Sequence, residues 1–433
     1  MKKLPRRQML KALALSGVTA ALPKLTHARS IFGRKRKPIR EFGRIYDYLK
    51  DAQLRLKEKQ KDRVVIKDAE FNGEDFINVA WGYHDFVNCH FPASYRIQLL
   101  QLANCNFIEC EFGPSRDDDS IQFGECRDVV FRKCKIARGS LVFEGKAQFE
   151  ECEFDSLNSD PNHRHILIGD DVTLTKCKAS DYTWRGNEKL TVHNCVFGVG
   201  RLSSGLTNNV SDDFIITNST FENAEKIFWA TKVKNLTIRR CVAKGIFRTQ
   251  GLIVEDTALF EHLKEGFFSL ASTSFYGKLH VKNCTFSTPG KSTVEDTPDY
   301  LFICSGRIPR EVLVERVVCK GSDACNLTSV HDGGNYFFTE KHKNEVFIVR
   351  DCQILYLKIN WLKTKHLRLE NCEIGQLEIR DAQIGKLEIV KTKFDRLDLS
   401  RTVATEYALD ASGEIVDTGS NYDKATGKAG RKR

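Results

Sequence analysis

The sequence predicts an all-β chain wound into a solenoid of stacked parallel strands, with an amphipathic helix covering its N-terminal end. Two observations predict the solenoid: a five-residue inward pattern near the C-terminus, and a strand–Cys-x-Phe signature that recurs before it. A third, one apolar stripe within a basic segment, predicts the helix. With 433 residues, 41% of them hydrophobic, the chain can bury a large core.

Residues 1–28 have the layout of an export signal. Arg6 and Arg7 lie in a basic segment, an apolar stretch covers residues 10–22, and small residues at 26–28 suit cleavage. The segment resembles a twin-arginine (Tat) signal, which implies the Tat export machinery as a partner and a periplasmic or extracellular location. A general-secretory signal with two arginines is the alternative. The apolar run is too short for a permanent membrane span.

Residues 29–63 are predicted to form a basic linker and a capping helix. Pro38 suits a first helical position. Apolar residues then recur at steps of three and four and form one stripe: Ile39, Phe42, Ile45, Leu49, Ala52 and Leu56. We expect this stripe to cover the open end of the solenoid. A basic amphipathic helix lying on a membrane is the alternative.

The net charge of +10 is concentrated at the two ends. Residues 1–28 carry +6, residues 29–63 carry +8 and residues 422–433 carry +4, so residues 64–421 carry −8. A mildly acidic body gives no reason to expect a nucleic-acid partner. The basic ends suit an anionic membrane surface or an acidic polymer, or are simply solvated.

A five-residue pattern runs over residues 347–404. Steps of five from Phe347 to Thr402, together with the residue two after each, give 24 positions, of which 21 are apolar and three are Thr. No α-helix has this period, whereas residues two apart in a strand share a face. Each unit therefore sends two side chains inward, and four units close one coil. Cys372, Ile374, Leu377 and Ile379 are predicted to be inside.

The same inward signature recurs upstream with looser spacing, often 16 to 25 residues, which fits one coil plus insertions. It reads as a strand followed by Cys-x-Phe or a variant, at Cys89, Cys105, Cys110, Cys134, Cys152, Cys195, Ser219 and Cys284. One solenoid domain over 64–404 is predicted, followed by a polar tail at 405–433. Trp229 and Trp361 are expected to pack inside it.

On these repeats the chain resembles right-handed parallel β-helix proteins of the pectate-lyase-like type over about residues 64–346. Over 347–404 it resembles pentapeptide-repeat proteins. The resemblance implies a right-handed parallel β-helix. It implies no single activity, because such folds serve lyases, hydrolases, adhesins and scaffolds.

The 15 cysteines fit an interior role. Nine of them are followed two residues later by Phe or Ile, so they share the inward face and behave as small hydrophobic residues. We expect mostly reduced thiols, with disulfides in an oxidising compartment as the alternative. Cys126, Cys304 and Cys325 fall outside the pattern and are the cysteines expected to pair.

One group of candidate site residues lies in an irregular segment at 155–171. Asp160, His163, His165, Asp170 and Asp171 are close in sequence. They could ligate a cation or supply an acid/base pair. The paired aspartates resemble those of polygalacturonases, but the Gly-His-Gly and Arg-Ile-Lys motifs of that family are missing. An ordinary polar turn is the alternative.

A second group lies in segments 179–188 and 199–213, which are expected to be loops. Tyr182, Trp184 and Arg185 form an aromatic and basic cluster suited to stacking on a sugar ring. Arg201, together with Lys232 outside these segments, could neutralise uronate carboxylates, and Arg201 is also a candidate catalytic residue.

Two functions from different classes remain. The first is an exported β-helix that serves as a cell-envelope scaffold or as a polysaccharide- or protein-binding module. The alternative is a polysaccharide lyase or glycoside hydrolase acting on an acidic glycan, for which a divalent cation such as calcium is the expected cofactor.

Overall fold

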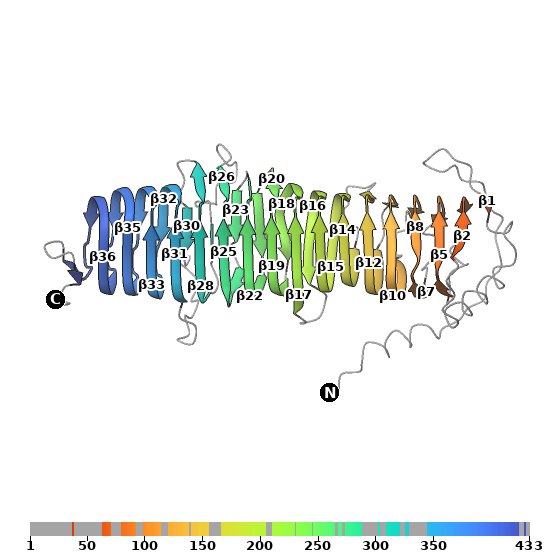
Figure 1. Ribbon diagram of the computed structural model, residues 1–433, viewed down its shortest axis with the longest axis horizontal. Coiled ribbons are helices and arrows are strands. Elements are labelled where there is room, and N and C mark those ends of the chain that lie inside the picture. Colours follow the sequence, from red (N-terminus) through yellow and green to blue (C-terminus); the bar gives the residue numbers. More distant parts are fainter. Residues whose placement is uncertain are drawn as a thin grey trace, which may run out of the picture.

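The chain folds as a parallel β-solenoid in a computed structural model. The structure describes residues 37–38, 63–70, 79–91, 98–113, 120–137, 140–155, 166–204, 210–229, 231–244, 246–264, 267–270, 273–287, 302–303, 309–320, 325–328, 344–423 and 428–429. Within them, 36 strands join in one hydrogen-bonded network, and each strand pairs in parallel with a strand of at least one neighbouring coil. Figure 1 shows the result, a rod whose coils follow one another in sequence order.

One sheet runs the length of the rod, and we call it the ladder sheet. Its strands are β2 (Val64–Lys67), β5 (His84–Val87), β8 (Asn106–Ile108), β10 (Ser120–Arg132), β12 (Ser140–Glu150), β14 (Ile166–Thr175), β15 (Lys178–His193), β17 (Ser211–Thr217), β19 (Lys232–Arg239), β22 (Leu252–Glu261), β25 (Lys278–Lys282), β28 (Glu311–Glu315), β31 (Asn344–Arg350), β33 (Lys363–Glu370), β35 (Gln383–Asp398) and β36 (Val403–Val416).

The remaining strands build the other sides of the coils. A set that follows the ladder sheet along the chain comprises β3 (Ala69–Glu70), β6 (His90–Phe91), β9 (Glu111–Phe112), β11 (Lys135–Ala137), β13 (Glu153–Asp155), β16 (Val196–Ser204), β18 (Thr220–Trp229), β20 (Val242–Ala243), β26 (Thr285–Ser287), β29 (Val318–Lys320), β32 (Gln353–Ile359) and β34 (Glu373–Glu378). The others are β1 (Lys37–Pro38), β4 (Val79–Gly82), β7 (Gln98–Ala103), β21 (Ile246–Gln250), β23 (Phe267–Leu270), β24 (Thr273–Phe275), β27 (Phe302–Ile303), β30 (Cys325–Thr328), β37 (Tyr422–Asp423) and β38 (Lys428–Ala429).

A single left-handed residue turns the chain at the end of each ladder strand from β2 to β33, and at Lys391 within β35. Its φ lies between 48° and 56° in Asp68, Asn88, Glu109, Lys133, Glu151, Lys176, Asn194, Asn218, Arg240, His262, Asn283, Arg316, Asp351, Asn371 and Lys391. A positive φ changes the direction of the chain within one residue, so the side chain of the next residue points into the core. Asn is frequent here because its short polar side chain tolerates the αL region.

The residue after this corner is usually a buried cysteine, and its thiol takes part in the corner's hydrogen bonds. The Cys134 thiol donates to the carbonyls of Arg132 and Phe107, at 3.5 and 3.3 Å. Ser219 occupies the same position, where its hydroxyl donates to the Thr217 carbonyl and accepts the Cys195 N–H. The corner therefore favours a small side chain that can both donate and accept.

The predicted interior is confirmed. All 24 positions of the five-residue pattern are buried, none more than 6% exposed, including Cys372, Ile374, Leu377 and Ile379. Strand registers repeat every 20 residues in this part of the rod, as four units per coil require, for example Phe347 with Leu367 and Leu367 with Leu387. Upstream, phenylalanine rings stack between coils, with centroids 4.6–4.9 Å apart along Phe86, Phe107, Phe131 and Phe149.

The thirteen cysteines whose side chains the structure describes are free thiols. Cys126 is among these and is buried, so the expectation that it pairs was wrong. Its inward position in β10 explains this, because it sits in the core like the pattern cysteines. Cys304 and the side chain of Cys325 lie outside the described residues.

Trp361 was also predicted wrongly. It is 38% exposed, and its φ of 56° places it at a left-handed corner, one residue before the buried Leu362. A corner residue points away from the core whatever its hydrophobicity. The side chain of Trp229 lies outside the described residues.

The two ends of the rod differ from expectation. Pro38, expected to begin a helix, instead ends strand β1 and is aligned with Glu70 of β3. The rest of the predicted capping helix and the signal segment with Arg6 and Arg7 lie outside the described residues. At the other end the ladder continues past residue 404, because β36 pairs with β35 as far as Val416.

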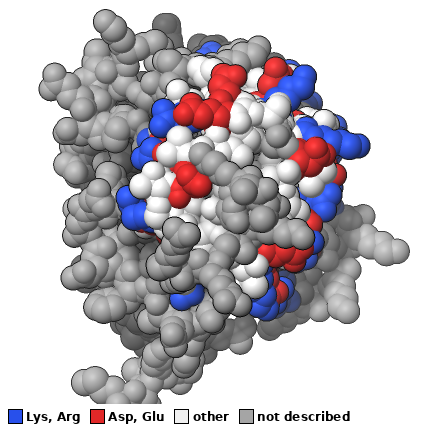
Figure 2. Space-filling model, turned by 90° about the vertical axis from the view of Figure 1, so that its left-hand side faces the viewer, with Lys and Arg blue, Asp and Glu red and all other residues white. Residues whose placement is uncertain are grey.

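The C-terminal coil is closed by an asparagine. The Asn421 side-chain amide accepts the Ala404 N–H at 3.0 Å and donates to the Ala404 carbonyl at 2.8 Å, so it replaces the backbone of a further strand. The buried Tyr407 donates its hydroxyl to the same Asn421 oxygen and packs on Tyr422. Figure 2 views this end, where Lys and Arg lie mainly around the rim.

No helix in the described part of the chain is long and apolar enough to span a membrane.

Candidate functional site

Three of the predicted site residues, Asp160, His163 and His165, lie outside the described residues. Asp170 and Asp171 are adjacent in β14 and have separate partners. Asp171 pairs with Lys146 of the preceding coil at 3.5 Å. The two aspartates thus have different neighbours, although they are adjacent in the sequence.

Asp170 serves a local structural need. Its carboxylate accepts the Gly145 N–H at 2.8 Å. The register of β12 against β14 shifts between Val142 and Lys146, so Gly145 lies in a bulge. Gly145 has φ +91°, and a Cβ there would lie 2.0 Å from the Cys126 carbonyl oxygen, so only glycine fits.

The aromatic and basic candidates lie on neighbouring strands, not in loops as expected. Tyr182, Trp184 and Arg185 belong to β15, and Arg201 belongs to β16. The backbone register aligns Arg201 with Thr183, between Tyr182 and Trp184. The topology therefore brings two strands that carry these residues side by side. Their side chains lie outside the described part of the structure.

Lys232 begins β19 and is engaged within the rod. Its ammonium lies 2.9 Å from the Glu255 carboxylate of the next coil. Among the described residues no group of three His, Cys, Asp or Glu side chains could hold a metal ion.

The most regular surface is the outward side of the ladder sheet, which we call the ladder face. Each strand presents three outward residues in three rows. The middle row is uncharged over ten successive strands and forms a central column: Val130, Gln148, Thr173, Thr191, Ile215, Thr237, Leu259, His280, Leu313 and Ile348. Five members of the central column are aliphatic and partly exposed: Val130, Ile215, Leu259, Leu313 and Ile348.

Charges on the two outer rows alternate in sign from coil to coil. One row runs Lys146, Asp171, Lys189, Asp213 and, further along, Lys278 and Glu311. The other runs Arg239, Glu261, Lys282, Glu315 and Arg350. Because neighbouring coils lie about 4.8 Å apart, each of these charges meets an opposite charge on at least one side, where a like charge would repel it.

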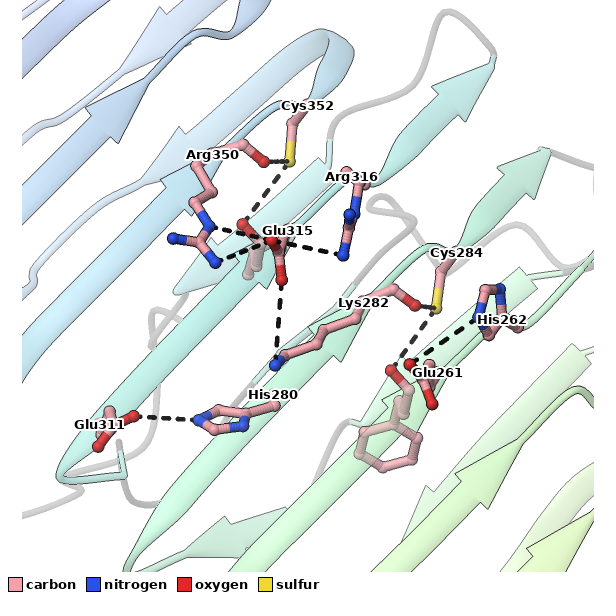
Figure 3. A network of polar contacts seen from close by, with 12 residues as sticks. Glu261, His262, His280, Lys282, Cys284, Glu311, Glu315, Arg316, Arg350 and Cys352 are labelled. Atoms are coloured by element: carbon pink, nitrogen blue, oxygen red, sulfur yellow. Dashed lines mark hydrogen bonds and ion pairs between the residues drawn. The ribbon is translucent and has the colours of Figure 1, made fainter.

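Glu315 is the centre of one such network (Figure 3). Its carboxylate is only 9% exposed and contacts Arg350 at 2.8 Å, Arg316 at 3.5 Å and Lys282 at 3.9 Å. Lys282, the corner residue Arg316 and Arg350 belong to three successive coils. Such a carboxylate is held in place by several hydrogen bonds and locks the register of these coils.

Two histidine–carboxylate pairs lie on the same face. His280 Nε2 is 3.0 Å from Glu311, and His366 Nε2 is 2.8 Å from Glu388. The hydrogen bond with His280 holds the pKa of the Glu311 carboxyl below its usual value, and Lys278 acts in the same direction. Lys386, followed by His366, lowers the pKa of Glu388. Both carboxylates are therefore suited to remaining ionised as partners of cations.

Sequence reasoning did not find the ladder face. Its partners are far apart in the chain, as with Glu315 and Arg350, and inserts of different length separate them. The Asn-Cys pairs at 88–89, 104–105, 194–195, 283–284 and 371–372 were the available signal for the corners. Once the corner residues are identified, the outward-facing residues of each strand can be assigned, because successive side chains of a strand alternate between the two faces.

Comparisons with protein-family models, curated proteins and solved structures give no match to this chain. What this chain shares with β-helix proteins is the parallel β-solenoid architecture.

Proposed function

We propose that this protein is an exported β-solenoid that serves as a scaffold or binding module in the cell envelope. The observation that carries the proposal is the continuous register of the rod, in which charged side chains of the ladder face pair with each other between coils. Because the charged side chains of this surface pair with one another, they are held in place, and the surface offers a long regular contact area. The twin-arginine-like signal supports export before the rod meets its partner.

The strands that carry Arg185 and Arg201 are the proposed contact for a polysaccharide. Arg201 aligns with Thr183, two residues before Arg185, so the two arginines lie at strand positions of the same face, a combination suited to uronate groups. Trp184 instead aligns with Leu202 and through it with the buried Phe228. A protein of the envelope is the other proposed partner class. Binding at this place uses a sheet different from the ladder face.

Export is tested by cell fractionation of the full chain and of a variant carrying Arg6→Lys and Arg7→Lys. The proposal predicts that the unchanged chain reaches the periplasm or medium and that the variant stays inside the cell. If both are exported equally, the general-secretory alternative is correct. If neither leaves the cell, the proposed location is wrong.

The enzymatic alternative is a lyase or hydrolase acting on an acidic glycan. Incubation with a panel of uronic-acid polymers, followed by absorbance of unsaturated products and by reducing-end release, separates the two functions. The proposal predicts retention on at least one polymer with no product. Product formation that is lost in Arg201→Ala would instead support the enzyme.

A further inference from the structure

We propose that the ladder face is the interface of an antiparallel homodimer, in which β19 of one copy lies over β22 of the other. This goes beyond the proposed function and does not depend on it. Three features carry the inference: the aliphatic content of the central column, the coil-by-coil alternation of charge, and the area of the face.

The central column is unusually apolar for an outward row. Leu313 and Ile348 are aligned on neighbouring strands, and Val346 lies two residues before Ile348, so three partly exposed aliphatic side chains adjoin one another. Leu259 and Ile215 extend the column toward the middle of the rod. Partly exposed aliphatic residues arranged in a row on a flat sheet suit a surface that is covered by a partner.

Charge alternation makes the face complementary to itself. With β19 over β22 and the two rods antiparallel, three pairs of outer-row charges near the centre of the face meet with opposite sign. Arg239 of one copy then faces Glu261 of the other, and Lys189 faces Glu311 in the same way. Asp213 likewise faces Lys278. These oppositions follow from strand order and register alone. Glu150 opposite Glu370, at the two edges, is the exception.

The area is adequate for a stable dimer. Ten strands from β12 to β33, about 4.8 Å apart, with three outward residues each, give a face of about 43 by 20 Å, or roughly 850 Å² on each copy. Standard protein interfaces bury about 800 Å² per partner. Two sheets pack face to face about 10 Å apart, so the central columns meet over β14 to β31 while the charged rows form the rim. At each end of the interface Gln148 of β12 faces Arg368 of β33 in the other copy.

Sedimentation equilibrium of the protein over a range of concentrations tests the dimer. Thr237→Arg places a large charge at the centre of the interface, next to the two-fold axis. Ile215→Arg places one on β17, the neighbouring strand further from the axis. Leu355→Arg is the matched control, because Leu355 is 54% exposed on β32, which belongs to another sheet.

We expect a dimer for the unchanged chain and for Leu355→Arg, and at least a tenfold weaker dimer for Thr237→Arg and Ile215→Arg at an unchanged melting temperature. A monomer at all concentrations, a dimer that survives both ladder-face substitutions, or equal loss in Leu355→Arg overturns the proposal. If Thr237→Arg lowers the melting temperature, Ile215→Arg decides alone.

Discussion

The left-handed corner residues are the smallest features on which the fold depends. Each turns the chain once per coil, and non-glycine residues there accept a conformation that costs an ordinary residue about 1–2 kcal/mol. The cost is offset because the corner lets a buried cysteine, serine or threonine bond the backbone of two coils, as the Cys134 thiol does with the Arg132 and Phe107 carbonyls.

Lys176→Val is expected to lower the free energy of unfolding by about 1–2 kcal/mol, because a β-branched residue fits the αL region poorly. Lys178→Val is the control. Both lysines are exposed and each pairs with one glutamate, Glu151 or Glu153. Lys178 lies in strand β15, so its substitution should change stability by no more than about 0.5 kcal/mol. Equal effects in urea unfolding would show that the corner is not strained.

The buried thiols are expected to resist alkylation in the folded protein. Burial raises the pKa of Cys105 and of Cys241 to about 11, and that of Cys284 to about 12. A thiolate is the reactive form, so iodoacetamide at pH 8 should leave these three unmodified until denaturant is added. Peptide mass mapping measures this. Labelling of any of the three in the native state would contradict their placement.

At the scale of the strand, the ion pairs between outer-row residues of neighbouring coils determine the order in which the coils stack. A coil shifted by one position would bring cation over cation and anion over anion along the outer rows, for example Lys282 onto Arg350 in place of Glu315. Alternation thus favours one stacking order and disfavours pairing with the same strand of another chain.

Glu315→Gln should destabilise the rod by about 2 kcal/mol, because it removes a nearly buried carboxylate that accepts charged hydrogen bonds from Arg350. Glu345→Gln is the control. Glu345 is 51% exposed and pairs with Lys365 at 3.5 Å, so its loss should cost less than about 0.5 kcal/mol. Chemical denaturation of both variants measures the difference, and similar losses would contradict the central role of Glu315.

Acid should lower the free energy of unfolding of the rod. The pKa values of Glu311, Glu388 and Asp381 are lowered in the folded state, by His280, Lys386 and Arg401 respectively as the first cause. Groups with a depressed pKa bind fewer protons when folded. Their contribution is therefore complete above the unfolded value of about 4 and is lost as the pH falls through the folded value.

Urea midpoints measured between pH 7 and pH 3 should fall with decreasing pH below about 4. Glu388→Gln should flatten that fall, since it removes one of the titrating carboxylates. An identical pH dependence in the variant and the unchanged chain would show that this pair does not contribute.

The interior could be predicted from the sequence, and the exterior could not. Inward positions repeat with a fixed period, so Cys372 and Ile374 were placed correctly. Trp361 was misplaced because hydrophobicity outweighed its position next to Leu362, where the corner falls. The ion pairs of Glu315 depend on inserts that separate it from Arg350 in the chain, and no local pattern records their length.

For the whole molecule, stability is a sum over neighbouring coils, so both ends need closure. Asn421 supplies it at the C-terminal end by pairing with both backbone groups of Ala404. A rod closed in this way, with its ladder charges matched, leaves its other faces available to a long polymer. This suits a protein that holds material in place along its length.

The most direct test of the proposed role is co-sedimentation of the folded protein with isolated cell-envelope polymers, followed by sizing of the polymer before and after. Binding without conversion predicts saturable retention and an unchanged polymer length, with retention weakened in Arg201→Ala. Absence of retention, or a progressive shortening of the polymer in the presence of the protein, would contradict it.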